Sequence, residues 1–192
     1  MCPGGKGLRQ PADIEGIIRR YYAPDSLACS VLKEHGAMVA RKALDVAGRV
    51  EHLSPDRLFL EEAALLHDIG IILTHAPGIG CNGDKDYICH GYLGRELLEK
   101  EGLPEHGLVC ERHIGLGLLA SDIESHGLPL PRRDMLPITL EEKIICYADK
   151  FYSKNIGSLD REKTVDKVRQ EVGRFGEDGL RRFEELHALF SR

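Results

Sequence analysis

The chain has 192 residues, a net charge of −5 and 42% hydrophobic residues. This length and composition predict one globular domain with a substantial core. The negative charge disfavours a non-specific nucleic-acid binder, which needs a broad basic surface. No apolar run approaches the roughly 18 residues of a membrane span, and six scattered cysteines without a C-x-x-C pair are typical of a reduced, cytoplasmic compartment.

The first part of the chain predicts a short helix and then a long one. Residues 1–11 are expected to be disordered, because the chain opens with a glycine-rich stretch that lacks an apolar core. Isoleucines at helical spacing predict a helix over residues 12–22, which Pro24 ends. The longer helix is expected over residues 26–50, and His35 lies on its apolar stripe. A histidine there is either a core residue or a ligand.

A third helix is expected from about residue 55 to residue 68. Ser54 is a suitable N-cap, and Pro55 fits the first helical position because its missing N–H has no intrahelical partner there. Apolar residues follow at helical spacing. Gly70 is expected to supply the left-handed turn that ends the helix.

The end of this helix carries the doublet His67-Asp68, within the stretch Ala-Ala-Leu-Leu-His-Asp-Ile-Gly of residues 63–70. Burying an imidazole beside a carboxylate costs free energy unless something compensates them. A divalent metal ion would do so. Taken alone, the doublet also fits an ordinary capped helix end.

Two further helices are expected after a loop that is rich in glycine, proline, asparagine and aspartate. The first spans about residues 87–101 and carries His90 in its first turns. Pro104 starts the second, which carries His106, Arg112 and His113. His106 is close to the helix start and is expected to be exposed.

The last part predicts a long loop, a capped helix and a helical tail. Residues 120–138 contain three prolines around Arg132-Arg133, which fit a solvated charge pair or a phosphate contact. Thr139 opens a capping box for a helix with Asp149 on its buried face. The tail from about 160 to 190 is predicted to be amphipathic and to pack on the domain or on a second subunit, as in a homodimer.

The candidate ligands share one order along the chain: His35, His67, Asp68, His90, His113 and Asp149. Over roughly residues 25–155 this order resembles the HD superfamily of metal-dependent phosphohydrolases, in its His-Asp-Ile-Gly subgroup. The chain is also similar to uncharacterised archaeal and bacterial members of that subgroup. Helical periodicity throughout, with no sustained strand pattern, predicts an all-α domain of five core helices and a peripheral C-terminal helix. The resemblance implies that this is a single HD-domain helical bundle over residues 12–192.

The resemblance also implies a ligand set for two divalent transition metals. His35, His67, Asp68 and Asp149 would hold one ion, and Asp68 would bridge to a second, held also by His90 and His113. Six ligands without cysteine indicate a catalytic site rather than a closed structural zinc site. Imidazole and carboxylate suit Fe, Mn, Co, Ni or Zn. Two such ions would leave a positive field suited to a phosphate anion.

The activity implied is hydrolysis of a nucleotide or another small phosphoester by attack of a metal-activated hydroxide. Asp68 would be essential as the bridging ligand. Many dinuclear members have a lysine directly after His-Asp-Ile-Gly, whereas Ile71 follows here. Arg112 and Lys150, each next to a proposed ligand, are the candidates for the missing phosphate contact. Two alternatives remain open, an HD-fold mixed-valent di-iron oxygenase and a non-catalytic nucleotide-binding module.

Overall fold

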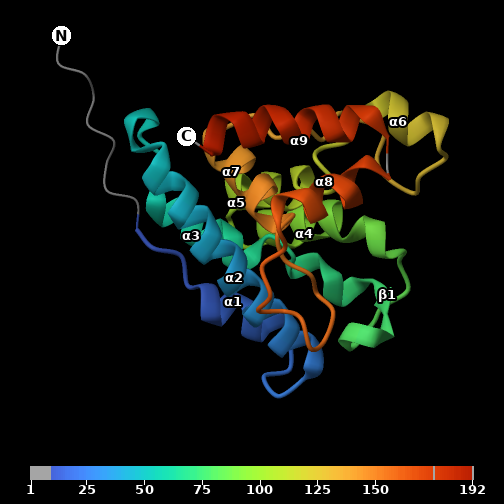
Figure 1. Ribbon diagram of the computed structural model, residues 1–192. Coiled ribbons are helices and arrows are strands. Elements are labelled where there is room, and N and C mark those ends of the chain that lie inside the picture. Colours follow the sequence, from blue (N-terminus) through green and yellow to red (C-terminus); the bar gives the residue numbers. More distant parts are fainter. Residues whose placement is uncertain (1–9, 175, 192) are drawn as a thin grey trace, which may run out of the picture.

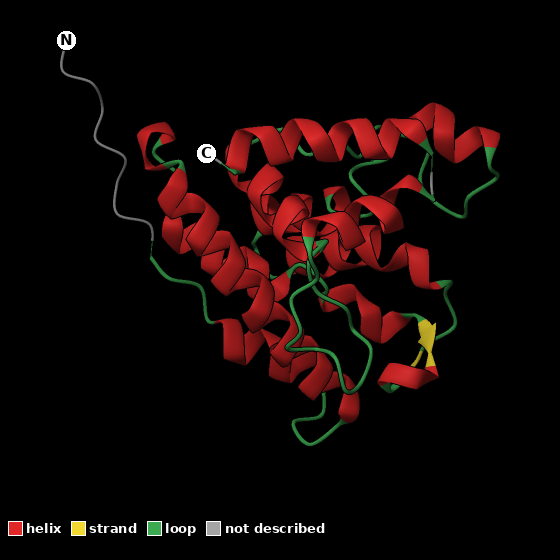
Figure 2. Ribbon diagram, viewed as in Figure 1, coloured by secondary structure: helices red, strands yellow, loops and turns green. Residues whose placement is uncertain are grey.

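The computed structural model describes residues 10–174 and 176–191 and shows a bundle of helices (Figures 1 and 2). Within that part, one small antiparallel sheet pairs β1 (His75–Ala76) with β2 (Cys81–Asn82). The α-helices of the same part are α1 (Ile14–Tyr21), α2 (Leu27–Arg49), α3 (Arg57–Leu66), α4 (His90–Lys100), α5 (Pro104–Arg112), α6 (Ala120–Ser125), α7 (Leu140–Asp149), α8 (Val165–Gly173) and α9 (Glu177–Phe190). The predicted all-α class is confirmed. The predicted disorder of residues 1–11 falls mostly on residues 1–9, which lie outside the described residues.

The centre of the bundle is α2, which packs against α3 and α7, while α4 and α5 pack against each other. The apolar stripe predicted for α2 is fully buried, as Val39, Ala43 and Val46 show. These residues share one core cluster with Leu60 of α3 and Ile145 of α7. Each Å² of apolar surface removed from water stabilises the packed helices by about 25 cal/mol. The helices α2, α3 and α7 therefore form a packed core.

The third helix begins later than the sequence predicted. Asp56, not Ser54, is the N-cap of α3, and its carboxylate accepts a hydrogen bond from the Phe59 amide (3.0 Å). Ser54 instead has a left-handed backbone (φ 55°) and ends a short 3₁₀ turn at residues 51–53. Aspartate caps a helix as well as serine does, and the sequence prediction overlooked Asp56. The expectation of a helix starting at Pro55 was wrong by two residues.

Gly70 does not supply a left-handed turn, so that expectation was wrong as well. It lies in the 3₁₀ segment Ile69–Leu73, and it is not among the described glycines with positive φ. Its small size is needed for a different reason. A Cβ added at Gly70 would overlap the carbonyl oxygen of His90 and the backbone nitrogen of Gly94. The missing side chain lets the segment after α3 lie directly against α4.

The region predicted as one long loop contains a helix. Residues 120–125 form α6, and the carboxylate of Asp122 accepts a hydrogen bond from the Leu119 amide at its start. Leu118 then pairs with Met135 in an isolated β-bridge. A six-residue helix with one buried side chain leaves little apolar periodicity in a sequence.

The C-terminal helices pack on the domain, as one of the two expectations for the tail had it. In Figure 1, α9 runs along one side of the bundle, as predicted for a peripheral helix. Its Phe183 and Phe190 are nevertheless fully buried in the main core cluster. The ring of Tyr147 from α7 lies 5.7 Å from the Phe183 ring and nearly parallel to it. The tail thus braces α7, the helix that ends at Asp149.

None of the helices in residues 10–174 and 176–191 combines the length and the apolar character needed to cross a membrane.

Candidate metal centre

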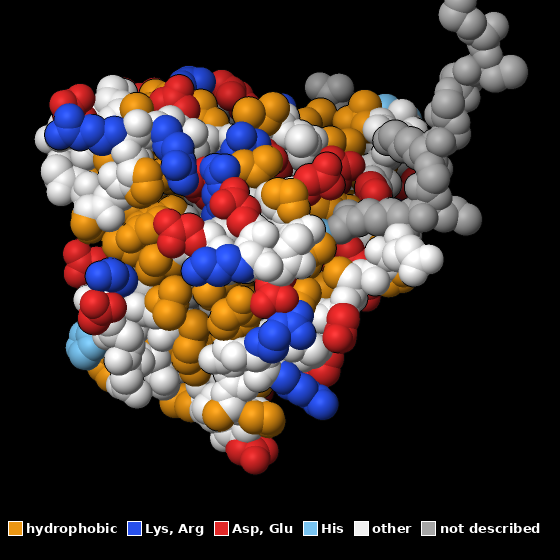
Figure 3. All heavy atoms as spheres, turned by 180° about the vertical axis from the view of Figure 1, so that it is seen from behind, with side chains coloured by type: hydrophobic (Ala, Val, Ile, Leu, Met, Phe, Trp, Pro, Cys, Tyr) orange, Lys and Arg blue, Asp and Glu red, His pale blue; other side chains and the backbone are white. Residues whose placement is uncertain are grey.

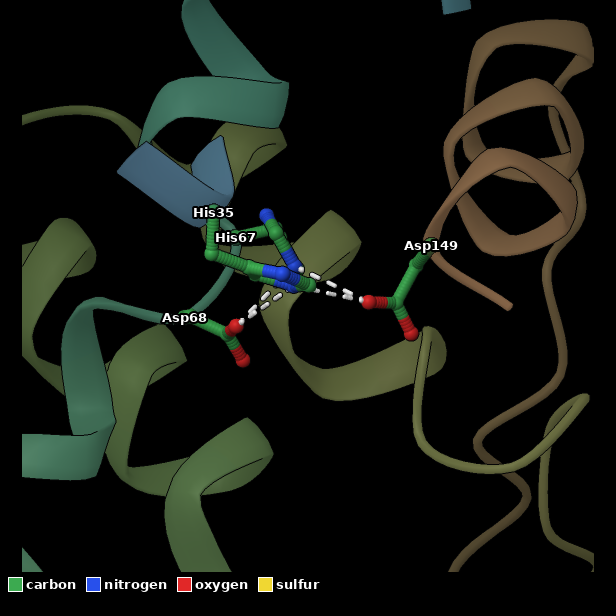
Figure 4. Close-up of side chains that lie close together, drawn as sticks. All are labelled: His35, His67, Asp68 and Asp149. Carbon is green, nitrogen blue, oxygen red and sulfur yellow. Dashed lines mark hydrogen bonds and ion pairs between the residues drawn. The ribbon is translucent and has the colours of Figure 1, made fainter. Parts of the chain in front are cut away.

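Six buried side chains converge at one point of the bundle. Their ligand atoms form two groups, and within each group these atoms lie within 4.8 Å of one another. The first group is His35, His67, Asp68 and Asp149, and the second is Asp68, His90 and His113. Figure 4 shows the first group, with both carboxylates turned toward the two imidazoles. The structure thus brings all six sequence-predicted ligands together.

The ends of helices deliver most of these side chains. Asp149 is the last residue of α7, and His90 is the first of α4. His67 and His113 cap the C-terminal ends of α3 and α5, and Asp68 follows directly. The exception is His35, which lies in the middle of α2, on its buried face. Five elements therefore have to dock before the site exists.

Asp68 lies between the two groups, and each of its oxygens faces a different pair of histidines. Its Oδ2 is 3.3 Å from His35 Nε2 and 3.1 Å from His67 Nε2. Its Oδ1 is 3.2 Å from His90 Nε2 and 3.4 Å from His113 Nε2. Asp149 completes the first group, with Oδ1 3.0 Å from His35 Nε2 and 3.5 Å from His67 Nε2. A carboxylate in this position can bridge two cations.

Backbone carbonyls fix the orientation of three imidazole rings. The Nδ1–H of His67 donates to the carbonyl of Ala64, that of His90 to Tyr87 and that of His113 to Cys110, at 2.6–2.7 Å. In each case the carbonyl is three residues earlier in the chain. A proton held on Nδ1 leaves the lone pair of Nε2 free for a ligand, as in metal-bound histidines. All three Nε2 atoms point into the cluster.

These nitrogen and oxygen atoms, all of which carry lone pairs, need a positive charge between them. With both Nδ1 atoms protonated, His90 and His113 turn bare Nε2 lone pairs toward each other at 3.2 Å. The Nε2 of His67 and the Oδ1 of Asp68 are buried without a hydrogen bond from any described residue, and the Oδ2 of Asp68 has Lys154 as a cationic neighbour. Acceptors that face one another in a buried site are costly unless a cation lies between them. The donor set therefore fits divalent metal ions.

The pKa values respond to the same crowding. Burial alone would raise the pKa of Asp68, but His67 and Lys154 outweigh it and hold that pKa well below the usual range. Burial lowers the pKa of His67, yet the two carboxylates outweigh it and raise the pKa to about 9. Burial lowers the pKa of His113 to about 4. In the absence of a metal ion, the cluster thus draws a proton to His67.

Two lysines accompany the carboxylates. Lys150, which the sequence singled out, has its Nζ 2.8 Å from Asp149 Oδ2 and donates to the carbonyl of His113 (3.3 Å). Lys154, which the sequence analysis missed, has its Nζ 2.7 Å from Asp68 Oδ2. It follows α7 in a polar stretch, Ser-Lys-Asn, that is typical of a solvated turn. No local pattern could have indicated it.

Lys154 also lines a cavity of about 360 Å³, so it connects the cluster with the surface. Residues of the segment after α7, orange in Figure 1, and of the turn after β1 line this cavity. The side chains concerned include Ile79, Tyr87, Ser153, Lys154, Asn155 and Lys163. Tyr87 is 38% exposed, and its ring lies 4.7 Å from that of His90.

Arg112 is not brought to the cluster. Its guanidinium donates two hydrogen bonds to the carboxylate of Glu142, at 2.8 and 3.0 Å. Neighbouring residues on a helix point about 100° apart, so the arginine beside His113 faces another way. Its phosphate contact stays a prediction that would require it to leave Glu142. The two arginines of the doublet are also engaged elsewhere: Arg133 forms an ion pair with Glu111, and the exposed Arg132 forms one with Glu124.

His106 was predicted to be exposed, and this was wrong. It is buried, with Nε2 3.2 Å from Glu62 Oε2, and its ring packs on Phe59. The carboxylate of Glu62 also accepts a hydrogen bond from the Ala12 amide (2.6 Å). The closeness of His106 to the helix start did not decide its exposure, because α3 covers that face of α5.

Comparison with known proteins identifies the family. The model of the HD domain matches residues 32–153, which include every residue of the cluster. The chain belongs to the HD domain family. An HD domain with these buried clusters suggests a metal-dependent hydrolase. The chain resembles no protein of known structure closely enough for a match.

Several relatives of this HD domain are archaeal. The chain is 36% identical to an uncharacterised protein of Methanocaldococcus jannaschii over 139 residues, 70% of this chain and 75% of that protein. It is 33% and 28% identical to proteins of Picrophilus torridus and Thermoplasma volcanium that are named tRNA (cytidine(56)-2'-O)-methyltransferase. These matches span 73% and 97% of this chain but only 38% and 49% of the two relatives.

Proposed function

We propose that this HD domain is a dinuclear metal-dependent phosphohydrolase that acts on a nucleotide or another small phosphoester. The observation that carries the proposal is the position of Asp68, whose two oxygens face separate histidine pairs. His35, His67, Asp68 and Asp149 would hold one ion. Asp68, His90 and His113 would hold the other.

The protein residues would keep this site ready for a phosphate. Two bound divalent ions would supply a water nucleophile at neutral pH and stabilise the negative charge of the reacting phosphate. The carbonyl-bound histidines keep their Nε2 atoms turned inward. Lys150 holds the outer oxygen of Asp149, which leaves Oδ1 for the cluster. The exposed ring of Tyr87 offers a face on which a base could stack, which supports a nucleotide.

A small phosphoester is favoured over a folded nucleic acid. The bridging ligand Asp68 is 1% exposed, and Lys154, which contacts it, lines a cavity of only about 360 Å³. On the face in Figure 3, basic and acidic side chains are interspersed and do not form one basic surface. The relatives named tRNA methyltransferases are longer than the match, so their methyl transfer need not reside in the shared part.

The first test is metal stoichiometry. After reconstitution, elemental analysis should give close to two equivalents per chain, and His90→Ala or His113→Ala should give close to one with the helical spectrum unchanged. The exposed His126 is a matched control, since His126→Ala should retain both ions. A wild-type protein that never exceeds one equivalent would contradict the dinuclear site but not the hydrolase.

The second test is turnover. A panel of phosphomonoesters, cyclic nucleotides and dinucleoside polyphosphates should be assayed with Mn, Co, Ni, Fe and Mg. Asp68→Ala should lose metal binding and hydrolysis together, because it removes a ligand from both ions. The proposal fails if no phosphoester is cleaved with any metal. Oxygen consumption by the iron-loaded protein with an organic substrate would instead favour the oxygenase alternative.

A further inference from the structure

Lys154 is bound to the cluster in a way that Lys150 is not. Its Nζ lies on Asp68 Oδ2, the oxygen that faces His35 and His67. Lys150 lies on the outer oxygen of Asp149, which faces away from the histidines, and it also donates to a backbone carbonyl. Metal binding among the first four donors would therefore compete with Lys154 and leave the contacts of Lys150 in place.

The competition is electrostatic. A divalent ion among these donors would share the electrons of Asp68 Oδ2 and place two positive charges close to the ammonium group of Lys154. Like charges at such separations repel strongly in a buried site. A lysine has a flexible four-carbon stem, so its ammonium group can turn away without a change in the backbone. The side chain of Lys154 is 17% exposed and lines the cavity, so its alternative position is inside that cavity.

We propose that Lys154 is the phosphate-binding side chain of this site. It neutralises Asp68 while no metal is bound, and it binds the phosphate in the cavity once Asp68 is occupied by metal. The inference rests on the proposed function only for the class of ligand. It places the substrate's phosphate between the cluster and the segment that follows α7. Lys154 is a direct substrate contact in this scheme, and Lys150 only positions Asp149.

The proposal predicts effects of opposite sign for one substitution. In Lys154→Met, calorimetric titration of the metal-free protein should show tighter binding of Mn²⁺, on the order of tenfold, because a competing cation is gone. Titration of the Mn²⁺-loaded protein with inorganic phosphate should show binding weakened about ten- to a hundredfold, the usual worth of a hydrogen bond to a charged group. Lys167→Met, on the surface of α8, removes the same charge and should change neither affinity.

If Lys154 had only a structural role, Lys154→Met would weaken the binding of both Mn²⁺ and phosphate, and that result would overturn the proposal. So would unchanged phosphate binding in Lys154→Met, or a loaded wild-type protein that binds no phosphate. Lys154→Gln keeps a polar side chain beside Asp68 and gives the same contrast if Lys154→Met does not fold. Lys154→Arg should retain phosphate binding. If phosphate binds through Lys154 but no ester is cleaved, the proposed function fails while this inference stands.

Discussion

The hydroxyl of Tyr22 holds the segment that carries the doublet, although it touches no ligand. It donates to the carbonyl of Ile69 (2.7 Å) and accepts from the amide of Ile72 (3.3 Å), in a fully buried place. Tyr22→Phe removes both hydrogen bonds from a buried place, so we expect a loss of about 1–3 kcal/mol in the free energy of unfolding. Urea denaturation would measure it.

The neighbouring tyrosine provides the control for this experiment. Tyr21 donates a hydrogen bond to Glu101 at the edge of the molecule (2.7 Å). Because water can replace that partner, Tyr21→Phe should cost no more than about half a kcal/mol. Equal losses in the two variants would show that the hydroxyl of Tyr22 has no special structural role.

The buried thiols should respond to pH. Burial raises the pKa of Cys81 to about 11, above the value of about 8.5 for an unfolded chain. The folded protein thus keeps a proton that the unfolded chain loses. The stabilisation is complete below about pH 8.5 and declines as pH rises toward 11, by about 1.4 kcal/mol per pH unit. Unfolding at pH 8 and pH 10 should show this decline, and Cys81→Ala should make it shallower.

Alkylation provides an independent check on the same burial. Cys29, Cys81, Cys89, Cys110 and Cys146 are all buried and free. Mass spectrometry should find these five unmodified after iodoacetamide treatment of the native protein at pH 8.5, and modified after treatment in urea. Rapid native labelling of any of them would contradict the packing described above.

Side chains show where sequence reasoning succeeds and where it stops. The ligands could be predicted because each is a distinctive residue at a recognisable place in an ordered pattern. Lys154 could not, because nothing local separates it from a solvated lysine. Arg112 and His106 show a second limit. Position along a helix is readable from the sequence, but the face that a neighbouring helix covers is set by packing between distant segments.

At the scale of elements, the crossing of the segment after α3 over α4 depends on Gly70. Because a Cβ there would overlap backbone atoms of His90 and Gly94, Gly70→Ala should destabilise the protein by about 1–3 kcal/mol or more. It should also weaken metal binding, since His90 starts α4. Gly48→Ala is the control, because an added Cβ on the exposed face of α2 meets nothing within 4 Å. It should stabilise by about 0.4–1 kcal/mol. Thermal unfolding and metal titration would separate the two.

The helix α9 should matter for stability far more than its outlying place suggests. Phe183 is fully buried against Tyr147 and Phe151 of the α7 region. Phe183→Ala should cost about 3–5 kcal/mol, whereas Leu189→Ala, at a position 38% exposed, should cost much less. Chemical denaturation of the two variants would test this. Similar small losses would mean that α9 is only laid on the surface.

The long helices could be predicted because their apolar spacing repeats over several turns. Helix ends and short helices could not. The start of α3 was misplaced because Asp56, two residues after Ser54, caps a helix equally well, and α6 has too few buried residues to leave a pattern. Gly70 was misread because its role depends on a helix that begins 20 residues later.

At the scale of the whole molecule, metal should stabilise the fold, because the donor groups are assembled only in the folded chain. An ion at 100 times its dissociation constant adds about 2.7 kcal/mol to the free energy of unfolding. Removal of metal by a chelator should therefore lower the melting temperature, and added metal should restore it. Asp68→Ala should abolish the response. A melting temperature that changes neither with chelator nor with added metal would contradict the metal centre.

His35 and Asp149 meet across 114 positions of the sequence, with the other four ligands between them. A growing chain therefore cannot complete the first group of donors until α7 has left the ribosome and docked. Incompletely synthesised chains would lack a complete binding site for transition metals. Metal content would thus report completed folding, and an ion held there would act as a reversible cross-link between distant parts of the polypeptide.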